Sequence, residues 1–201
     1  MKKVLVLAAF AVFGLTTMNA QDGVDKVINQ AKNGGFKVGA NLGLAVSSAS
    51  KDFGSFNFGF DAAYLFEVME NLEVGLLVGY TQFVADGRYS YEVYDDNGDF
   101  TTLSFDYKDA SFVPISSSAR YYFGDRKFFG GIDLGYAINV NGDADDGFYY
   151  RPKFGYNLGM ITIIASYQGI SGGVDYHNGT GFNSVSLSGF NSFNAGVEFG
   201  F

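Results

Sequence analysis

The sequence predicts an all-β protein: a closed transmembrane barrel of eight antiparallel strands in up-and-down order, preceded by a short periplasmic segment. Three observations predict it. From Phe36 onward, bulky apolar residues alternate with small or polar ones, which is the period of a β-strand. No segment reaches the roughly 20 consecutive apolar residues that a membrane-spanning helix needs. Short and long connections alternate along the chain, as expected of a barrel that crosses a membrane.

The composition limits the classes of protein to consider. The chain has 201 residues, of which 47% are hydrophobic and only 17% are charged, so we expect one domain. It contains no cysteine, which excludes disulfides, thiolate metal sites and a cysteine nucleophile. The net charge of -8 argues against nucleic acid as a partner.

The first 35 residues are expected to lie outside the barrel. Lys2 and Lys3 precede an apolar run at 4–15 and a polar stretch at 16–20, the order of a signal peptide cleaved after Ala20. Residues 21–35 form a periplasmic leader, either a short helix or a disordered segment. Residues 36–201 form the barrel.

The alternation assigns the two faces of each strand. It is regular in six segments, namely 36–47, 56–66, 72–81, 131–139, 153–159 and 192–201, and less regular in 112–123 and 161–170. A soluble barrel would also alternate, but its water-facing positions would carry many more charges. The small face is instead rich in glycine, which suits a narrow interior. We therefore expect the bulky residues to face lipid.

The charged residues of the strands share the inward parity and predict a network inside the lumen. Its predicted members are Lys37, Asp61, Glu73, Arg120, Asp133, Lys153 and Glu198. We expect these ions to fill and rigidify the barrel rather than to conduct solutes.

The long connections are predicted to face the cell exterior. They cover residues 48–55, 84–110, 140–148 and 171–186, whereas the short turns lie at 67–71, 124–127 and 159–160. Residues 84–110 alternate around a turn at 95–98, which predicts a hairpin extending beyond the bilayer. Aspartates dominate 84–110 and 140–148, so we expect an anionic outer rim.

Three features resemble the family of small outer-membrane β-barrels, which includes OmpA-type transmembrane domains, OmpX-like proteins and porin-family chains. They are the signal peptide, the strand at 112–124 with Pro114, and the alternating C-terminus that ends in an aromatic residue. The resemblance implies an outer-membrane location among lipid and lipopolysaccharide. It also implies a C-terminal signal for the barrel-assembly machinery, formed by Phe193, Val197, Phe199 and Phe201.

Signals for chemistry are weak, and we predict no catalytic, cofactor-binding or metal-binding residue. His177 is the single histidine and has Asp175 and several serines nearby, but the surrounding glycines predict a mobile loop. Residues 141–147 resemble a calcium loop with glycine displaced and Pro152 at the closing position, which favours a solvated acidic turn.

The sequence thus favours a non-enzymatic barrel that acts as a structural or surface-binding platform through acidic external loops. A narrow small-solute porin is the alternative, and an enzyme that modifies lipid A is a remote third. The sequence does not identify the external ligand.

Overall fold

The computed structural model describes residues 35–46, 56–84, 88–94, 100–106, 109–142, 144–177 and 184–201. For residues 88–94, 100–106, 174–177 and 184–188 the description covers the backbone. The predicted signal peptide and residues 21–34 of the predicted leader lie outside the described residues. The described residues contain no helix of the length and apolarity that a membrane span requires.

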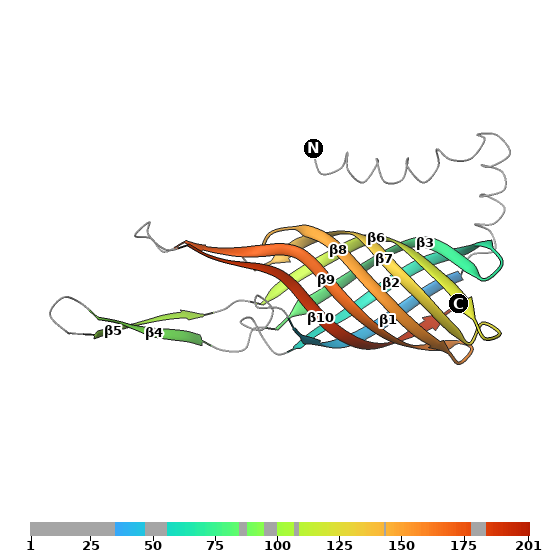
Figure 1. Cartoon of the computed structure of the whole chain (residues 1–201), viewed down its shortest axis with the longest axis horizontal. Helices are drawn as coiled ribbons and strands as arrows, with labels where there is room; N and C mark the ends of the chain where they lie inside the picture. Colours follow the sequence, from blue (N-terminus) through green and yellow to red (C-terminus); the bar gives the residue numbers. More distant parts are fainter. Residues whose placement is uncertain are drawn as a thin grey trace, which may run out of the picture.

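The described chain forms ten strands. They are β1 Gly35–Ala45, β2 Phe56–Met69, β3 Leu72–Phe83, β4 Arg88–Tyr94, β5 Phe100–Asp106, β6 Ala110–Phe123, β7 Phe128–Asn141, β8 Gly147–Asn157, β9 Ile161–His177 and β10 Ser184–Gly200. Eight of them close into an antiparallel barrel in the order β1-β10-β9-β8-β7-β6-β3-β2, while β4 and β5 pair separately (Figure 1). The predicted eight-stranded barrel in meander order is confirmed.

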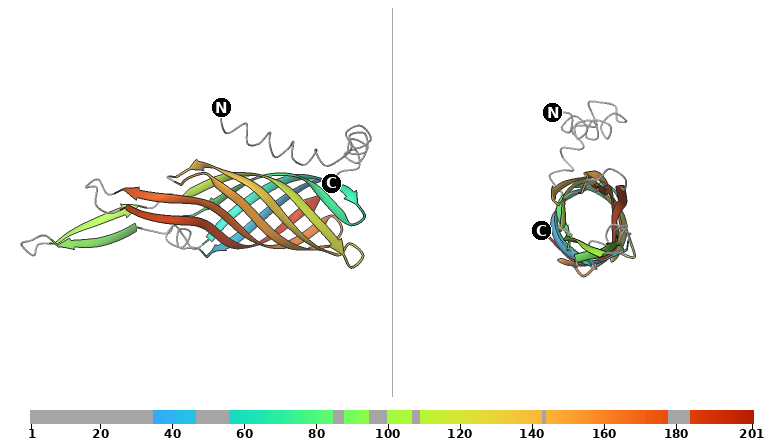
Figure 2. Two further views of the ribbon diagram at one scale, coloured as in Figure 1. Left: turned by 45° about the horizontal axis from the view of Figure 1, so that its top comes forward. Right: turned by 90° about the vertical axis from the view of Figure 1, so that its left-hand side faces the viewer.

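The two ends of the barrel differ. One end carries the short turns β2–β3, β6–β7 and β8–β9 and the C-terminus, and we call it the turn end (Figure 1). The other carries the β4–β5 hairpin and the part of β9–β10 that projects past the other strands, and we call it the hairpin end (Figure 2). Strands β1 and β10 close the wall in a regular register from Lys37↔Gly200 to Ala45↔Ser192.

The outer face of the barrel is an apolar belt. Leu42, Phe60 and Leu76 are 65%, 58% and 69% exposed. Each of the remaining five barrel strands also has exposed apolar residues at its outward positions. Aromatic rings gather near the turn end, where Phe123 stacks on Phe128 and both contact Phe154 of β8 at a tilt, while Phe128 also contacts Tyr156. The prediction that bulky residues face outward is confirmed.

Three predicted connections are wrong in extent, of which the turn at 67–71 is the smallest case, because β2 continues to Met69 and leaves only residues 70–71 before β3. The predicted loop 171–186 is mostly strand, because β9 continues to His177 and β10 begins at Ser184. The predicted loop 140–148 shrinks to 142–146, between the end of β7 and the start of β8. Glycine and aspartate are depleted in strands on average, but the paired backbone overrides that preference here. The hairpin predicted within 84–110 is present as the separate sheet β4–β5.

Candidate functional site

A buried bidentate ion pair crosses the lumen near the turn end. Arg120 on β6 donates from Nη1 and Nη2 to Oε1 and Oε2 of Glu198 on β10, both at 2.6 Å. The two side chains are 1% and 2% exposed. The guanidinium also lies 4.8 Å from the ring centroid of Phe129. Such a pair is tolerated inside a protein only when each charge keeps its partner.

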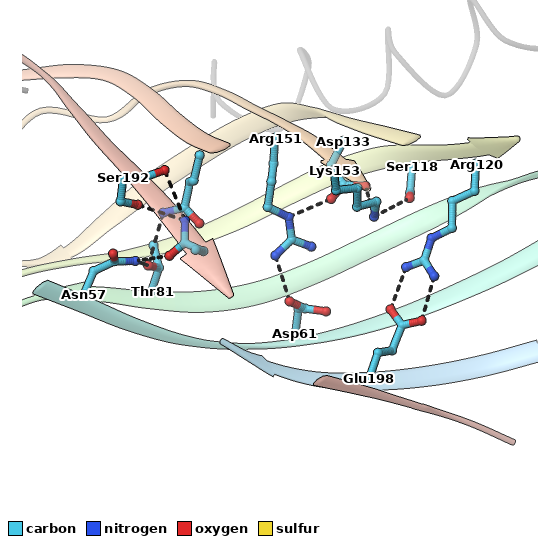
Figure 3. A network of polar contacts seen from close by, with 12 residues as sticks. Asn57, Asp61, Thr81, Ser118, Arg120, Asp133, Arg151, Lys153, Ser192 and Glu198 are labelled. Carbon is cyan, nitrogen blue, oxygen red and sulfur yellow. Dashed lines mark hydrogen bonds and ion pairs between the residues drawn. The ribbon is translucent and has the colours of Figure 1, made fainter. Parts of the chain in front are cut away.

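A second cluster lies next to this pair and joins two cations to two carboxylates. Asp133 on β7 accepts from Lys153 Nζ at 2.6 Å and from Arg151 Nε at 2.8 Å. Arg151 also donates from Nη1 to Asp61 on β2 at 2.9 Å, and Lys153 reaches Ser118 at 3.2 Å. Figure 3 shows these side chains pointing toward one another across the interior. The cluster ties strands β2, β6, β7 and β8 together without net charge.

A third group of charges closes the turn end. Arg126 lies in the β6–β7 turn and pairs with Glu73 at 2.6 Å and Glu67 at 2.9 Å. Its guanidinium lies 4.5 Å from the Tyr122 ring centroid, and the Tyr122 hydroxyl donates to Glu73 at 2.9 Å. Lys37 on β1 is 3.8 Å from Glu73. Charges from three separate strands and a turn thus converge at this mouth.

Uncharged polar groups fill the middle of the lumen on the hairpin side of the ion pairs. Asn57 donates to Asn194 at 3.0 Å, and Gln168 donates to Thr81 at 3.2 Å. Asn194 in turn donates to Ser192 Oγ at 3.0 Å. All of these side chains are buried, and Figure 3 places the labelled members of the group beside the Arg151 cluster.

An apolar cluster fills the lumen toward the hairpin end, and we call it the outer seal. Phe83, Phe112 and Phe190 meet with ring centroids 5.1 to 6.4 Å apart, and none of the three is exposed. Seven of the eight barrel strands contribute to the seal, whose other members are Ala45, Ala110, Ala137, Tyr149 and Ile170. Each member stands at an inward position of its strand. The side chains of the seal therefore occupy the hairpin end of the lumen, the space that water would fill in an open channel.

The seven residues of the predicted network all line the lumen. The structure joins Arg120 to Glu198, Lys153 to Asp133 and Lys37 to Glu73. Asp61 pairs instead with Arg151, which the sequence analysis missed. The prediction began that strand at residue 153, although Arg151 stands two positions earlier and therefore on the same face.

Two further features were not predicted from the sequence. Arg126 lies in a turn, where period two gives no information about side-chain direction. The outer seal was not predicted either, because its phenylalanines stand at inward strand positions, where the alternation predicts small and polar residues.

The C-terminal aromatic and apolar residues lie on the outer face. Phe193, Val197, Phe199 and Phe201 are all exposed, and the first three belong to β10. Their recognition by an assembly machinery stays a prediction.

The two segments considered and declined as chemical sites, around His177 and at 141–147, have different surroundings from those expected. His177 and Asp175 lie on β9, opposite Ser184 and Ser186 of β10 in the register, and so do not belong to a loop. In the calcium-like segment, Asp146 accepts from the Asn139 backbone at 2.8 Å, which gives that carboxylate a structural role. Among the described residues, no group of three metal-ligating side chains comes together.

Comparisons with known proteins add likeness of fold. No family model matches the chain, and no curated protein matches it. Solved structures with a similar fold include outer membrane protein AlkL, with 14% identity, 84% and 90% coverage of the two chains, and a TM-score of 0.42. Neisserial surface protein A has 16% identity, coverage of 84% and 97%, and a TM-score of 0.40.

Ail, the attachment invasion locus protein of Yersinia pestis, has 10% identity, coverage of 84% and 97%, and a TM-score of 0.40. These identities and TM-scores are low, so the fold is assigned from the strand order and the side-chain arrangement of this chain itself. Its closed antiparallel order, apolar exterior and polar interior are the architecture of a small transmembrane β-barrel.

Proposed function

We propose that the protein is an integral outer-membrane barrel that anchors a binding surface at the hairpin end, outside the cell. The observation that carries the proposal is the filled lumen. Ion pairs, a hydrogen-bonded polar layer and the outer seal follow one another along the barrel axis. An eight-stranded barrel is just wide enough for side chains to fill it, and here they do.

The outer surface supports the membrane location. The exposed residues of the apolar belt carry no charge among the described positions, whereas the buried charges all point inward. A charge on the lipid face near the bilayer centre costs roughly 2 to 4 kcal/mol. A closed barrel also pairs its backbone amides without leaving an edge, as the hydrocarbon environment demands. We expect outer-membrane lipid and lipopolysaccharide as neighbours, and the barrel-assembly machinery as a transient partner.

The projecting hairpins support a role in binding. Strands β4 and β5 pair only with each other, from Arg88↔Asp106 to Tyr94↔Phe100. Residues 86–109 contain seven acidic and two basic residues. In many proteins a rigid scaffold positions loops that carry the binding residues, and a barrel that presents an acidic hairpin has the same arrangement.

Planar-bilayer recording tests the proposal against the porin alternative. We expect the purified protein to insert without stable unitary conductance, because ions would have to displace buried pairs such as Arg120–Glu198. Stable conductance from pure protein would contradict the platform and support a pore.

A second experiment tests the external position of the hairpin. A peptide tag inserted after Asp96 is expected to be reached by antibody on intact cells. The matched variant carries the tag in the β8–β9 turn, after Gly159, and should require permeabilised cells. The reverse pattern would overturn the proposed orientation. Heat-modifiable migration of both variants on a denaturing gel controls for folding.

A further inference from the structure

Two ribbons project from the hairpin end of the barrel (Figure 1). One is the β4–β5 hairpin, whose strands pair only with each other in the described part of the chain. The other is the end of the β9–β10 pair, where residues 173–177 pair with residues 184–188, and we call it the outer ribbon. A two-stranded ribbon is marginally stable in water unless another strand or layer packs on it. Each ribbon would therefore be stabilised by a partner.

The register gives the β4–β5 hairpin one apolar face. In an antiparallel pair, residues opposite each other share a face, and the two faces alternate along the strands. The pairs of one face are bulky and mostly apolar, namely Tyr89↔Phe105, Tyr91↔Leu103 and Val93↔Thr101. The opposite face begins with the polar pairs Arg88↔Asp106 and Ser90↔Ser104. The hairpin is therefore amphipathic.

The outer ribbon has the same two-faced pattern. The pairs Val174↔Leu187 and Tyr176↔Val185 share one face. The positions between them belong to the opposite face and are polar residues or glycine. Both ribbons at this end of the barrel thus carry one apolar face and one polar face.

The ribbons continue the strands that form the outer seal. Phe83 is the last residue of β3, before the hairpin, and Phe112 lies near the start of β6, after it. Phe190 stands on β10 at the base of the outer ribbon. Two strands separate the β3–β6 pair from the β9–β10 pair on either side, so the two pairs face each other across the lumen. Phe83 and Phe190 still meet, with ring centroids 5.2 Å apart.

The two ribbons also reach a common level above the seal. The chain from Ile170 of the seal to His177 spans about 23 Å as a strand. The chain from Phe83 to Arg88 spans at most about 18 Å. The base of the hairpin can therefore lie level with the tip of the outer ribbon.

We propose that the two ribbons close on each other, apolar face to apolar face, and extend the outer seal into a two-layer cap over the mouth of the barrel. Packed β-layers lie about 10 Å apart. The cap goes beyond the proposed anchoring role, because it gives the external binding surface a closed form in which the apolar faces are covered.

Charge favours the outer ribbon over a second copy of the hairpin as the partner. Residues 86–109 contain seven acidic and two basic residues, so the hairpins of two separate copies repel each other. Residues 171–188 contain one aspartate and one histidine as their only ionisable side chains apart from tyrosine. The outer ribbon can therefore approach the acidic hairpin with little repulsion.

Crosslinking tests the proposal. The chain has no cysteine, so a pair of introduced cysteines reports on this contact alone. Tyr89→Cys with Val185→Cys places one thiol on each apolar face. The full chain is folded in lipid vesicles and treated with a short bismaleimide, and crosslinked peptides are identified by mass spectrometry. We expect a crosslink within one chain, which a mixture of isotope-labelled and unlabelled chains distinguishes from a crosslink between chains.

The matched control moves one thiol by a single residue. Ser90→Cys with Val185→Cys uses the polar face of the same strand, and we expect its crosslinking yield to be on the order of tenfold lower. Equal yields from the two pairs would overturn the proposal. Crosslinks that form only between separate chains would also overturn it and would identify a second copy as the partner.

A second variant removes the partner surface. Val174→Ser with Leu187→Ser, added to the Tyr89→Cys and Val185→Cys chain, makes the apolar face of the outer ribbon polar and should reduce crosslinking to the level of the Ser90→Cys control. Ser184→Thr with Ser186→Thr, on the opposite face, should leave it intact. Unchanged crosslinking after Val174→Ser with Leu187→Ser would contradict the proposal.

Heat-modifiable migration on a gel checks that each variant has folded. A folded chain without the expected crosslink would refute the cap and leave the proposed membrane anchor intact. A chain that never shows the compact form would refute the barrel on which both proposals depend.

Discussion

The two halves of the lumen are filled by opposite kinds of chemistry. Toward the hairpin end, Phe83, Phe112 and Phe190 exclude water by packing. Toward the turn end, the described ion pairs join five cations to five carboxylates. An apolar layer requires matching shapes, whereas an ionic layer requires each charge to have its partner. We therefore expect the ionic half to be more sensitive to loss of a single side chain.

The largest effect is expected from Asp133→Leu. It leaves the buried Lys153 without a carboxylate and Arg151 with Asp61 alone. Removing one partner of a buried pair costs about 3 to 5 kcal/mol, and we expect the upper end of that range. Urea unfolding of the folded barrel in lipid vesicles measures the change in free energy.

The matched control adds Lys153→Met to the same chain. The double variant removes the stranded ammonium and keeps the Arg151–Asp61 pair, so we expect it to recover more than half of the lost stability. If the double variant is as unstable as the single one, packing rather than charge dominates this layer.

A smaller loss is expected from Phe190→Ala in the outer seal. The ring contacts both Phe83 and Phe112, and its removal leaves a cavity worth about 3 to 4 kcal/mol. We also expect planar-bilayer recordings of this variant to stay closed, because the ionic layers remain. Phe193→Ala, on the lipid face of the same strand, is the control and should cost less. Steady conductance in Phe190→Ala would show that the seal alone closes the lumen.

The smallest effect is expected from Arg126→Ala at the turn end. Its side chain is 39% exposed, and solvent-exposed pairs contribute about 0.2 to 1 kcal/mol. We expect that loss to vanish at high salt in unfolding experiments. Arg126→Gly should cost less than Arg126→Ala, because residue 126 has a φ of 61° that glycine adopts freely. Equal losses would indicate that the turn is not strained.

Much of this architecture could be predicted from alternation alone. In a closed barrel, one face of every strand lines the narrow lumen and the other faces the broad exterior. The alternation along the strand therefore determines which of the two faces a residue such as Lys37 or Glu198 occupies. Pairing across the lumen could not be predicted. Arg120 meets Glu198 from a strand 78 residues away, and that match depends on strand register, which sequence periodicity does not contain.

Other errors came from interruptions of the pattern. The predicted strand begins at residue 153, whereas β8 begins at Gly147, so the prediction leaves out Arg151 and the Pro152 that interrupts the alternation beside it. The glycines at 172 and 173 suggest a loop, but β9 continues through them: Gly173 pairs with Ser188 of β10, next to a register shift between Ser188 and Phe190. Tertiary pairing thus outweighed local preference at both places.

The pairing of Arg120 with Glu198 links electrostatics to biogenesis. Glu198 belongs to the final strand, which also completes the wall against β1. Until that strand is in place, the guanidinium of Arg120 on β6 has no counter-ion across the cavity, and an intermediate without β10 carries an uncompensated positive charge on the wall opposite its open seam. Closure of the barrel by β10 and neutralisation of that charge therefore occur together, and a barrel that lacks the final strand is destabilised by the unpaired charge.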